Sequence, residues 1–243
     1  MNFKDWAPYY DKILAVFGFS KENDEKSAAC LSDYVRQHFP PATDVPLFEI
    51  RGREVIVCGN APSLKEEWKA WSLREQKKPS DLVVIAADGA ASVLMKLNIC
   101  PNVIVTDLDG RHEDDVDFEI DAYSKGAIIL IHAHGDNLDK LTRYLPILKQ
   151  KSSKDSVLIP TCQCRPPNNI YNFGGFTDGD RCVFLAEAFK AETITLLGFD
   201  FEDPDVSAFK KKKLNCARHL IQVLNDKRIR DGKNEIRYFR KSN

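Results

Sequence analysis

Two aspartates stand two residues apart in the stretch TDLDG, residues 106–110, directly after a short apolar run. Carboxylate oxygens on one short loop suit a hard cation such as Mg²⁺, which takes one or two carboxylates and completes its shell with water and substrate phosphates. We therefore predict Asp107 and Asp109 as catalytic residues and metal ligands. A solvated acidic turn is the alternative, because residues 111–115 continue the polar run.

Two further carboxylates end other apolar runs in the same way. Asp88 lies in AADGA, where it either joins the metal and nucleotide site or serves only as the N-cap of the next helix. Asp136 lies in HAHGDN, and we predict it as a third catalytic residue and a further metal ligand. The same stretch offers His134 and Asn137 as contacts to a phosphorylated nucleotide. His132 is either a hydrogen-bond donor there or an ordinary core histidine.

The stretch NFGGFTDGDR, residues 172–181, leads into a predicted helix. Gly174 and Gly175 allow close approach of the backbone to a ligand, and Thr177 is a good N-cap. The helix N-terminus beginning at Asp178 presents free N–H groups to an anion, and Arg181 can contact a phosphate through two hydrogen bonds. We predict a phosphate site from these residues; a glycine-rich turn before a capped helix is the alternative.

A second strand-to-helix turn is GNAPSL, residues 59–64. It matches neither the dinucleotide-binding G-x-G-x-x-G pattern nor a P-loop. Its helix N-terminus still suits an anion, and we predict Gly59, Asn60 and Ser63 as nucleotide or phosphate contacts. The basic run at 210–213 begins the last predicted helix and is either a solvated face or a mobile lid over phosphates.

Six short apolar runs alternate with helical patterns and position these groups: EVIVCG, DLVVIAAD, VIVTDLD, AIILIHAHGD, SVLIPT and TITLLGFD. Such runs are typical of strands buried on both faces, so we predict an α/β fold, a Rossmann-like three-layer domain with a mostly parallel sheet. Ligands of open parallel sheets bind beyond the carboxyl ends of the strands. The polar groups that end nearly every run therefore indicate one shared site.

Two amphipathic helices are predicted before the sheet, at about residues 2–17 and 22–39, the second ended by Pro40 and Pro41. We predict an N-terminal helical segment over residues 1–50 and an α/β catalytic domain over residues 51–243.

The 243 residues carry 35 basic and 36 acidic side chains, and 43% of them are hydrophobic. This balance is typical of a folded globular protein and favours neither nucleic acid nor a membrane surface as a partner. The seven cysteines do not show the spacing of a secreted disulfide scaffold. The sequence also has no signal peptide and no apolar run of about 18 residues, so we predict a cytoplasmic protein. Cys162 and Cys164 form a C-x-C pair. We interpret them as loop thiols; metal ligation is the alternative, although no second cysteine pair stands at zinc-finger spacing.

Taken together, the chain resembles the archaeal 6-hydroxymethyl-7,8-dihydropterin pyrophosphokinases, the MptE-like family, which is similar in fold to the catalytic domain of thiamine pyrophosphokinase. The matching stretches occur in the family's order over residues 59–201: GNAPSL, AADGA, TDLDG, HAHGDN, NFGGFTDGDR and LLGFDF. Two stretches depart from the pattern. Ala61 stands where the family usually has glycine, and PTCQCRPP stands where a small, Thr-rich turn is expected.

The resemblance implies transfer of the terminal diphosphate of ATP to the hydroxymethyl group of a reduced pterin, with Mg²⁺, release of AMP, and a role in the biosynthesis of a tetrahydromethanopterin or folate-type cofactor. It also implies pterin contacts from Gln163, Asn172, Phe173 and Asp200, small molecules as the partners, and a homodimer as one possible assembly.

Other functions stay open at this point. A thiamine pyrophosphokinase-like enzyme would carry acidic loops of the same kind, but also a C-terminal β-sandwich, whereas the tail here has a Lys-rich helical pattern. A non-catalytic nucleotide-binding module needs the anion-binding loops without several converging carboxylates. A methyltransferase ordinarily has a first loop richer in glycine than GNAPSL.

Overall fold

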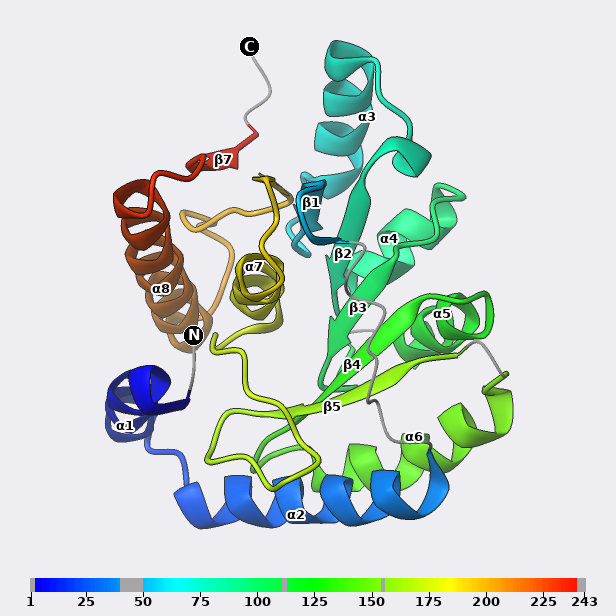
Figure 1. The fold of residues 1–243 in the computed structure, drawn as a ribbon, viewed down its shortest axis with the longest axis vertical. Helices are drawn as coiled ribbons and strands as arrows, with labels where there is room; N and C mark the ends of the chain where they lie inside the picture. Colours follow the sequence, from blue (N-terminus) through cyan, green and yellow to red (C-terminus); the bar gives the residue numbers. More distant parts are fainter. Residues whose placement is uncertain (1–2, 40–49, 111–112, 154–155, 240–243) are drawn as a thin grey trace.

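The computed structural model describes residues 3–39, 50–110, 113–153 and 156–239. Within this part of the chain, seven parallel strands form one sheet in the order β5-β4-β3-β2-β1-β6-β7 (Figure 1). The strands are β1 (Glu54–Cys58), β2 (Val83–Ala87), β3 (Val103–Thr106), β4 (Ile128–Ala133), β5 (Leu158–Cys162), β6 (Thr193–Leu197) and β7 (Ile236–Tyr238).

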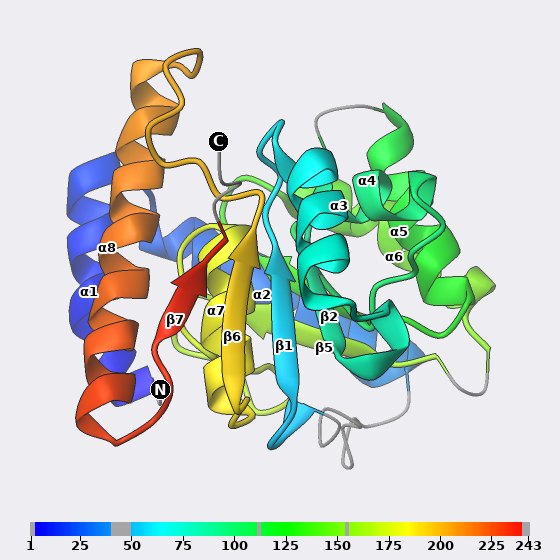
Figure 2. The ribbon, with the colours of Figure 1, turned by 90° about the horizontal axis from the view of Figure 1, so that it is seen from above.

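Helices cover both faces of this sheet, which gives the three-layer α/β arrangement predicted from the sequence. They are α1 (Phe3–Phe17), α2 (Lys21–His38), α3 (Leu64–Glu75), α4 (Ala90–Lys96), α5 (Glu113–Ser124), α6 (Leu138–Lys151), α7 (Asp178–Ala188) and α8 (Ala208–Arg230), with a 3-10 turn η2 at Pro79–Asp81. Helices α3, α4 and α5 lie on one face, and α7 packs on β1, β2 and β3 from the other (Figure 1). Helix α8 packs outside α7 (Figure 2).

The six apolar runs all form strands, and β2, β3 and β5 are buried at every position. β5 accommodates Pro160 because it is the edge strand, where a missing N–H donor is tolerated. The seventh strand, β7, was not predicted. It has only three residues, two of them exposed, and it forms because its backbone pairs with β6, which no side-chain pattern records.

The order of the strands determines where a ligand can enter. The chain passes from β1 through β2, β3 and β4 to β5 at one edge, then returns to place β6 on the other side of β1. Connections therefore diverge on either side of β1, and the loops that leave the carboxyl ends there separate to open a crevice. The polar stretches singled out in the sequence leave from these strand ends.

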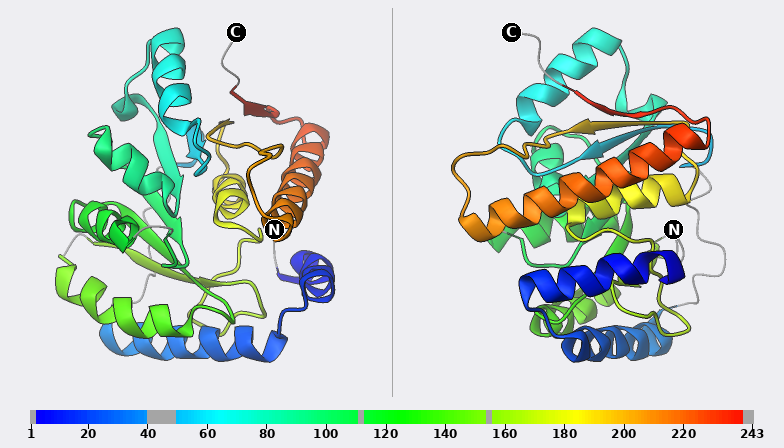
Figure 3. Two further views of the ribbon diagram at one scale, coloured as in Figure 1. Left: turned by 180° about the vertical axis from the view of Figure 1, so that it is seen from behind. Right: turned by 90° about the vertical axis from the view of Figure 1, so that its left-hand side faces the viewer.

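The two N-terminal helices are confirmed with nearly the predicted bounds, and they join the same hydrophobic core as the sheet. Trp6 of α1 packs edge-on against Phe184 of α7, and α2 packs on β4 and β5. Helix α1 also lies beside α8 (Figure 3). The Lys212 ammonium of α8 donates there to the Val16 carbonyl oxygen of α1 at 2.7 Å. Asn2, Pro40 and Pro41 lie outside the described residues. The division at residue 50 stays a prediction.

No described helix combines the length and the apolar character that crossing a membrane demands. All seven cysteines are free thiols, and Cys162 and Cys164 are both buried.

Gly198, which follows β6, provides a stability prediction. Its φ is +69°, and an added Cβ would lie 2.4 Å from the Gly59 carbonyl oxygen and 2.8 Å from the Leu64 Cβ. We expect Gly198→Ala to lower the free energy of unfolding by about 3 kcal/mol, because backbone strain and overpacking act together. Gly126→Ala is the matched control, since Gly126 also has a positive φ, +102°, but no atom near its Cβ position. Equal losses in urea unfolding would show that the close contacts with Gly59 and Leu64 are unimportant.

Candidate active site

Two adjoining cavities lie at the carboxyl ends of the strands. The first, of about 370 Å³, is called here the acidic cavity and is lined by Gly18, Phe19, Ser20, Asn23, Asp24, Asp88, Asp107, Asp109, His134, Gly135, Asp136, Gln163, Phe176, Thr177, Asp178, Arg181, Lys210 and Lys213. The second, of about 130 Å³, is called the aromatic cavity and is lined by Gly59, Asn60, Ala61, Pro62, Ala87, Asp88, Thr177, Asp178, Gly179, Gly198, Phe199, Asp200, Phe201, Asp203, Val206, Lys210, Leu214 and Ala217. The shared residues make the two cavities neighbours.

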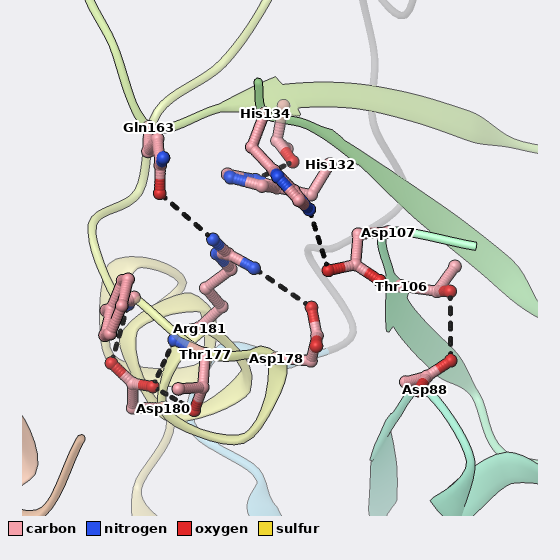
Figure 4. Close-up of polar contacts among 12 residues, drawn as sticks. Asp88, Thr106, Asp107, His132, His134, Gln163, Thr177, Asp178, Asp180 and Arg181 are labelled. Carbon is pink, nitrogen blue, oxygen red and sulfur yellow. Dashed lines mark hydrogen bonds and ion pairs between the residues drawn. The ribbon is translucent and has the colours of Figure 1, made fainter. Parts of the chain in front are cut away.

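All four carboxylates predicted as metal ligands line the acidic cavity: Asp88, Asp107, Asp109 and Asp136. Thr106, the last residue of β3, organises two of the loops that carry them. Its hydroxyl lies 3.5 Å from the Asp88 carboxylate (Figure 4). The same hydroxyl accepts from the backbone N–H of Leu108 at 2.9 Å. The β2 and β3 loops are thus held together at one point.

Burial, together with the crowding of these carboxylates, raises two pKa values. Burial, followed by the charges of Asp178 and Asp107, raises the pKa of Asp88 to about 7. Loss of hydration within the cavity, followed by the Asp107 carboxylate, raises the pKa of Asp109 to about 6. Like charges held this close are stabilised by a proton or a cation between them.

A carboxylate that the sequence analysis missed lies beneath this group. Glu119 of α5 is fully buried, and burial together with the neighbouring Asp88 raises its pKa well above the ordinary range. Its only sequence signal is an acidic residue among the apolar positions of an amphipathic helix.

His134 is held against Asp107 in a defined orientation. The backbone N–H of Asp136 donates to the His134 Nδ1 at 3.2 Å, so the ring proton lies on Nε2. That nitrogen lies 3.1 Å from the Asp107 Oδ2 and donates to it (Figure 4). The other carboxylate oxygen, Oδ1 of Asp107, is buried without a hydrogen-bond partner in the described part of the chain. An unpartnered buried oxygen of this kind is available to a cation.

Asn137 has a structural role in this geometry. Its side-chain amide donates to the backbone oxygens of Asp107 at 2.9 Å and His132 at 2.7 Å, and its oxygen accepts from the His134 N–H at 3.0 Å. It is 1% exposed and does not line the acidic cavity. Asn137 therefore joins the β3 and β4 loops, and its nucleotide contact stays a prediction.

Arg181 faces the carboxylates from the first turn of α7. Its guanidinium donates to the Asp178 carboxylate at 3.0 Å and to the Gln163 amide oxygen at 3.3 Å (Figure 4). The preceding loop is tightly packed, since Gly175 has a φ of +92° and an added Cβ there would lie 2.7 Å from the Arg181 Cα. Gly174 has a φ of +88°, and an added Cβ there would lie 2.7 Å from a ring carbon of Phe184.

The start of α7 confirms the predicted cap. Thr177 is the N-cap, and the Asp180 carboxylate accepts from the backbone N–H groups of Phe176 and Thr177, each at 2.7 Å. Thr177 and Asp178 line both cavities, so the helix N-terminus opens at the boundary between them.

The basic run at the start of α8 divides between two surroundings. Lys210 and Lys213 line the acidic cavity, and the positive charge of Lys213 opposes the rise in the pKa of Asp109. Lys212 instead donates to α1, and Lys211 pairs with Glu202 at 3.2 Å. The run is therefore neither wholly a solvated face nor wholly directed at the site.

The aromatic cavity contains three of the other predicted site residues, Gly59, Asn60 and Asp200. Ser63 lies at the start of α3 and lines a separate groove, to which Phe199 and Phe201 also contribute. The walls contributed by Phe199, Phe201 and Leu214 are apolar, which suits a flat ring system.

The predicted pterin contacts are dispersed. Gln163 lines the acidic cavity, but its amide group is engaged by Arg181 and by Asp24 of α2. Asn172 donates to the backbone oxygens of Gln163 and Cys164, each at 3.0 Å. Phe173 stacks on Tyr171, and neither Asn172 nor Phe173 lines the two cavities.

No group of three or more His, Cys, Asp or Glu side chains in the described residues forms a ready-made metal cage. Mg²⁺ needs only one or two carboxylates besides water and phosphate, and Asp107 retains an unpartnered oxygen. The residues of the acidic cavity therefore fit a magnesium ion that arrives with its phosphates. Arg111 and His112, part of the polar run after TDLDG, lie outside the described residues.

His132, at the end of β4, gives a pH-dependent prediction. The Thr161 hydroxyl donates to the Ile131 carbonyl at 3.1 Å, so it accepts from His132 Nδ1 at 3.0 Å, and His132 Nε2 is a buried acceptor without a partner among the described residues. Burial, followed by the charge of Arg181, lowers the pKa of His132 well below its ordinary value of 6.5.

Below pH 6.5 the unfolded state therefore binds a proton that the folded state resists, and stability falls as pH falls. We expect this residue to remove up to about 1.4 kcal/mol per pH unit on acidification from pH 6.5. His132→Gln lacks this loss. The free energy of unfolding of the wild type should therefore fall relative to that of the variant as the pH is lowered from 6.5 to 5. Parallel pH profiles in urea unfolding would contradict the assignment.

Comparisons with known proteins identify similar sequences. The family model described as 6-hydroxymethylpterin diphosphokinase MptE-like matches residues 33–206. The 6-hydroxymethyl-7,8-dihydropterin pyrophosphokinase of Methanocaldococcus jannaschii is 38% identical over 242 residues, which is 93% of this chain and 97% of the relative. The proteins of the same name from Methanothermobacter thermautotrophicus and Pyrococcus furiosus are 38% and 37% identical, over 92% of this chain and 95% and 94% of their own lengths.

The resemblance drawn from the sequence motifs is thereby confirmed. Because the family match spans more than half of the chain and the relatives align along almost their whole length, this chain belongs to the MptE-like family of 6-hydroxymethylpterin diphosphokinases.

Proposed function

We propose that this protein transfers the terminal diphosphate of ATP to the hydroxymethyl group of 6-hydroxymethyl-7,8-dihydropterin and releases AMP, with Mg²⁺ as the cofactor. The names of its relatives support the pterin and the diphosphate. The observation that carries the proposal within this structure is the acidic cavity, where six carboxylates, the four predicted metal ligands among them, share the lining with Arg181, Lys210 and Lys213. A magnesium triphosphate carries both signs of charge and matches such a cavity.

In this proposal Asp107 and Asp109 hold Mg²⁺, and Asp88 and Asp136 complete the acidic surroundings. The unpartnered Oδ1 of Asp107 and the raised pKa values of Asp88 and Asp109 support a cation there. When bound, Mg²⁺ supplies charge neutralisation and a fixed orientation to the phosphates. His134 holds the Asp107 carboxylate in place through its Nε2 donor.

The phosphate oxygens are assigned to the opposite wall. Arg181, the N-terminus of α7 at Thr177 and Asp178, and the ammonium groups of Lys210 and Lys213 supply positive charge and N–H donors. Gly174 and Gly175 act by shaping the loop that precedes this helix.

The ring systems of the two substrates are assigned to the space beside the phosphates. The aromatic cavity adjoins the acidic one through Asp88, Thr177 and Asp178, and its apolar walls suit one heterocycle. We assign the nucleotide to the side of Gly59 and Asn60. Pterin contacts from Asp200, Gln163, Asn172 and Phe173 remain predictions, as do a homodimer, the tetrahydromethanopterin or folate-type pathway and a cytoplasmic location.

The chemistry requires positioning and charge stabilisation rather than a covalent intermediate. The pterin hydroxyl oxygen forms a bond to the β-phosphorus of ATP, and the bond between that phosphorus and the oxygen bridging to the α-phosphorus breaks. AMP leaves with the bridging oxygen, and the hydroxyl proton passes to solvent. Arg181 and the lysines stabilise the negative charge that accumulates on the oxygens of the transferred group.

Two assays with ATP and Mg²⁺ test the substrate, one with 6-hydroxymethyl-7,8-dihydropterin and one with thiamine. We expect turnover with the pterin alone. The described residues after Asp200 form α8 and the short strand β7, which leaves them without the β-sandwich of a thiamine enzyme. Turnover with thiamine alone would overturn the substrate assignment, and ATP binding without turnover would favour a nucleotide-binding module.

A further inference from the structure

Asp24, in the first turn of α2, is a buried carboxylate at the wall of the acidic cavity. It is 1% exposed and lines the cavity together with Ser20 and Asn23 of the same segment. A carboxylate so deeply buried is found where several donors satisfy it. The N-terminal helices thus bring a charged group to the site as well as apolar packing.

Three donors from three other segments converge on Asp24. The Tyr10 hydroxyl of α1 donates to Oδ2 at 2.7 Å, and the Gln163 side-chain N–H donates to the same oxygen at 2.9 Å. The backbone N–H of Gly135 donates to Oδ1 at 2.7 Å. Gly135 stands between His134 and Asp136, and an added Cβ there would lie 2.8 Å from the Asn23 Cβ. Helix α2 therefore holds a loop whose three residues His134, Gly135 and Asp136 all line the acidic cavity.

The contact with Gln163 extends to Arg181. A side-chain amide has one donor end and one acceptor end, and here the donor end faces Asp24 while the acceptor end faces the Arg181 guanidinium at 3.3 Å. The negative charge of Asp24 thus determines which end of Gln163 meets Arg181. The same guanidinium is held on its other side by Asp178 at 3.0 Å.

We propose that Asp24 is a positioning residue that orients Arg181 for phosphate binding through the Gln163 amide. The proposal rests on the proposed function, because that function assigns Arg181 to the phosphates. It makes the N-terminal helical segment a working part of the site. Gln163 then acts between two protein groups, rather than as a direct contact to the pterin ring.

The order of donors and acceptors from Asp24 through Gln163 to Arg181 defines the test. In Asp24→Asn the new amide N–H₂ meets Gln163 where an oxygen stood before, so Gln163 rotates and presents its own N–H₂ to Arg181. Two donors then face each other, and Arg181 loses its orientation. Adding Gln163→Glu restores both contacts, because a carboxylate accepts from the new amide at position 24 on one side and from Arg181 on the other.

The measurement is the affinity for magnesium tripolyphosphate by calorimetry, which needs no turnover. We expect Asp24→Asn to weaken binding about tenfold. The double variant Asp24→Asn with Gln163→Glu should recover to within about twofold of wild type on the same scale. Asp33→Asn is the matched control, since Asp33 lies on the same helix, is exposed and pairs only with Arg36 at 2.7 Å in the described contacts.

A second variant protects the test against a loss of folding in Asp24→Asn. Gln163→Met keeps the bonds of Asp24 to Tyr10 and Gly135 but removes the acceptor for Arg181, and it should weaken binding by a similar factor. Unchanged tripolyphosphate affinity in Asp24→Asn or Gln163→Met, or a loss that Gln163→Glu does not restore, would overturn the proposal. Absence of pterin turnover in the wild type would instead overturn the proposed function. The tripolyphosphate affinities would still test the role of Asp24, because they do not depend on turnover.

Discussion

Asp107→Asn is expected to reduce kcat about 10³-fold at saturating ATP, Mg²⁺ and pterin. The substitution removes the negative charge that the proposed cation requires and replaces one oxygen by an N–H₂ group. That change falls on a carboxylate whose Oδ1 is unpartnered and whose Oδ2 already accepts from His134 at 3.1 Å. Steady-state kinetics with a product assay measures the loss.

The same variant should not be less stable than the wild type. The Asp107 charge contributes to raising the pKa values of Asp88 and Asp109, so its removal relieves repulsion in the folded protein. Thermal unfolding without Mg²⁺ should therefore give an equal or higher Tm. Asp139→Asn is the matched control, an exposed carboxylate in the first turn of α6. Normal turnover of a folded Asp107→Asn variant would remove Asp107 from the mechanism.

Arg181→Lys is expected to lower kcat/KM for ATP about 10²-fold, although the charge is kept. The guanidinium donates in two directions, to Asp178 at 3.0 Å and to Gln163 at 3.3 Å, and these contacts hold its plane towards the cavity. A lysine ammonium lacks the planar fork and cannot keep both contacts while also binding a phosphate. The measurement is the dependence of initial rate on ATP concentration.

Arg143→Lys provides the comparison for that measurement. Arg143 is an exposed residue of α6 that lies over the Tyr144 ring, and its replacement should leave kcat/KM unchanged. If Arg181→Lys also left kcat/KM for ATP unchanged, positive charge alone would account for the role of Arg181, and the planar, oriented guanidinium would be unimportant.

The layered fold follows from the sequence because each of its signals is local. Runs such as VVIAA in β2 are apolar at every position, short and rich in β-branched residues, which is typical of a strand buried on both faces. Each predicted loop begins where such a run ends, so the positions of Asp88, Asp107 and Asp136 at one edge follow from the parallel arrangement of the strands. β7 escaped prediction because two of its three residues are exposed.

The remaining parts of the site depend on contacts between distant segments. Asp24 meets Gly135 and Gln163, which are 111 and 139 residues away, and no spacing within α2 marks the pairing. Asn137 reads as a ligand contact from its motif, yet its side chain satisfies backbone groups of two loops. A polar residue directly after a strand indicates which edge of the sheet carries the site. Whether its side chain faces the ligand or a neighbouring loop depends on tertiary packing.

The central claim is diphosphate transfer, and the most direct measurement is the identity of the nucleotide product. Purified protein is incubated with ATP, Mg²⁺ and 6-hydroxymethyl-7,8-dihydropterin, and the nucleotides and pterins are separated and quantified over time. The account predicts AMP and pterin diphosphate in equal amounts, with no ADP and no AMP when the pterin is omitted. ADP formed together with a pterin monophosphate would contradict it, because attack would then fall on the γ-phosphorus.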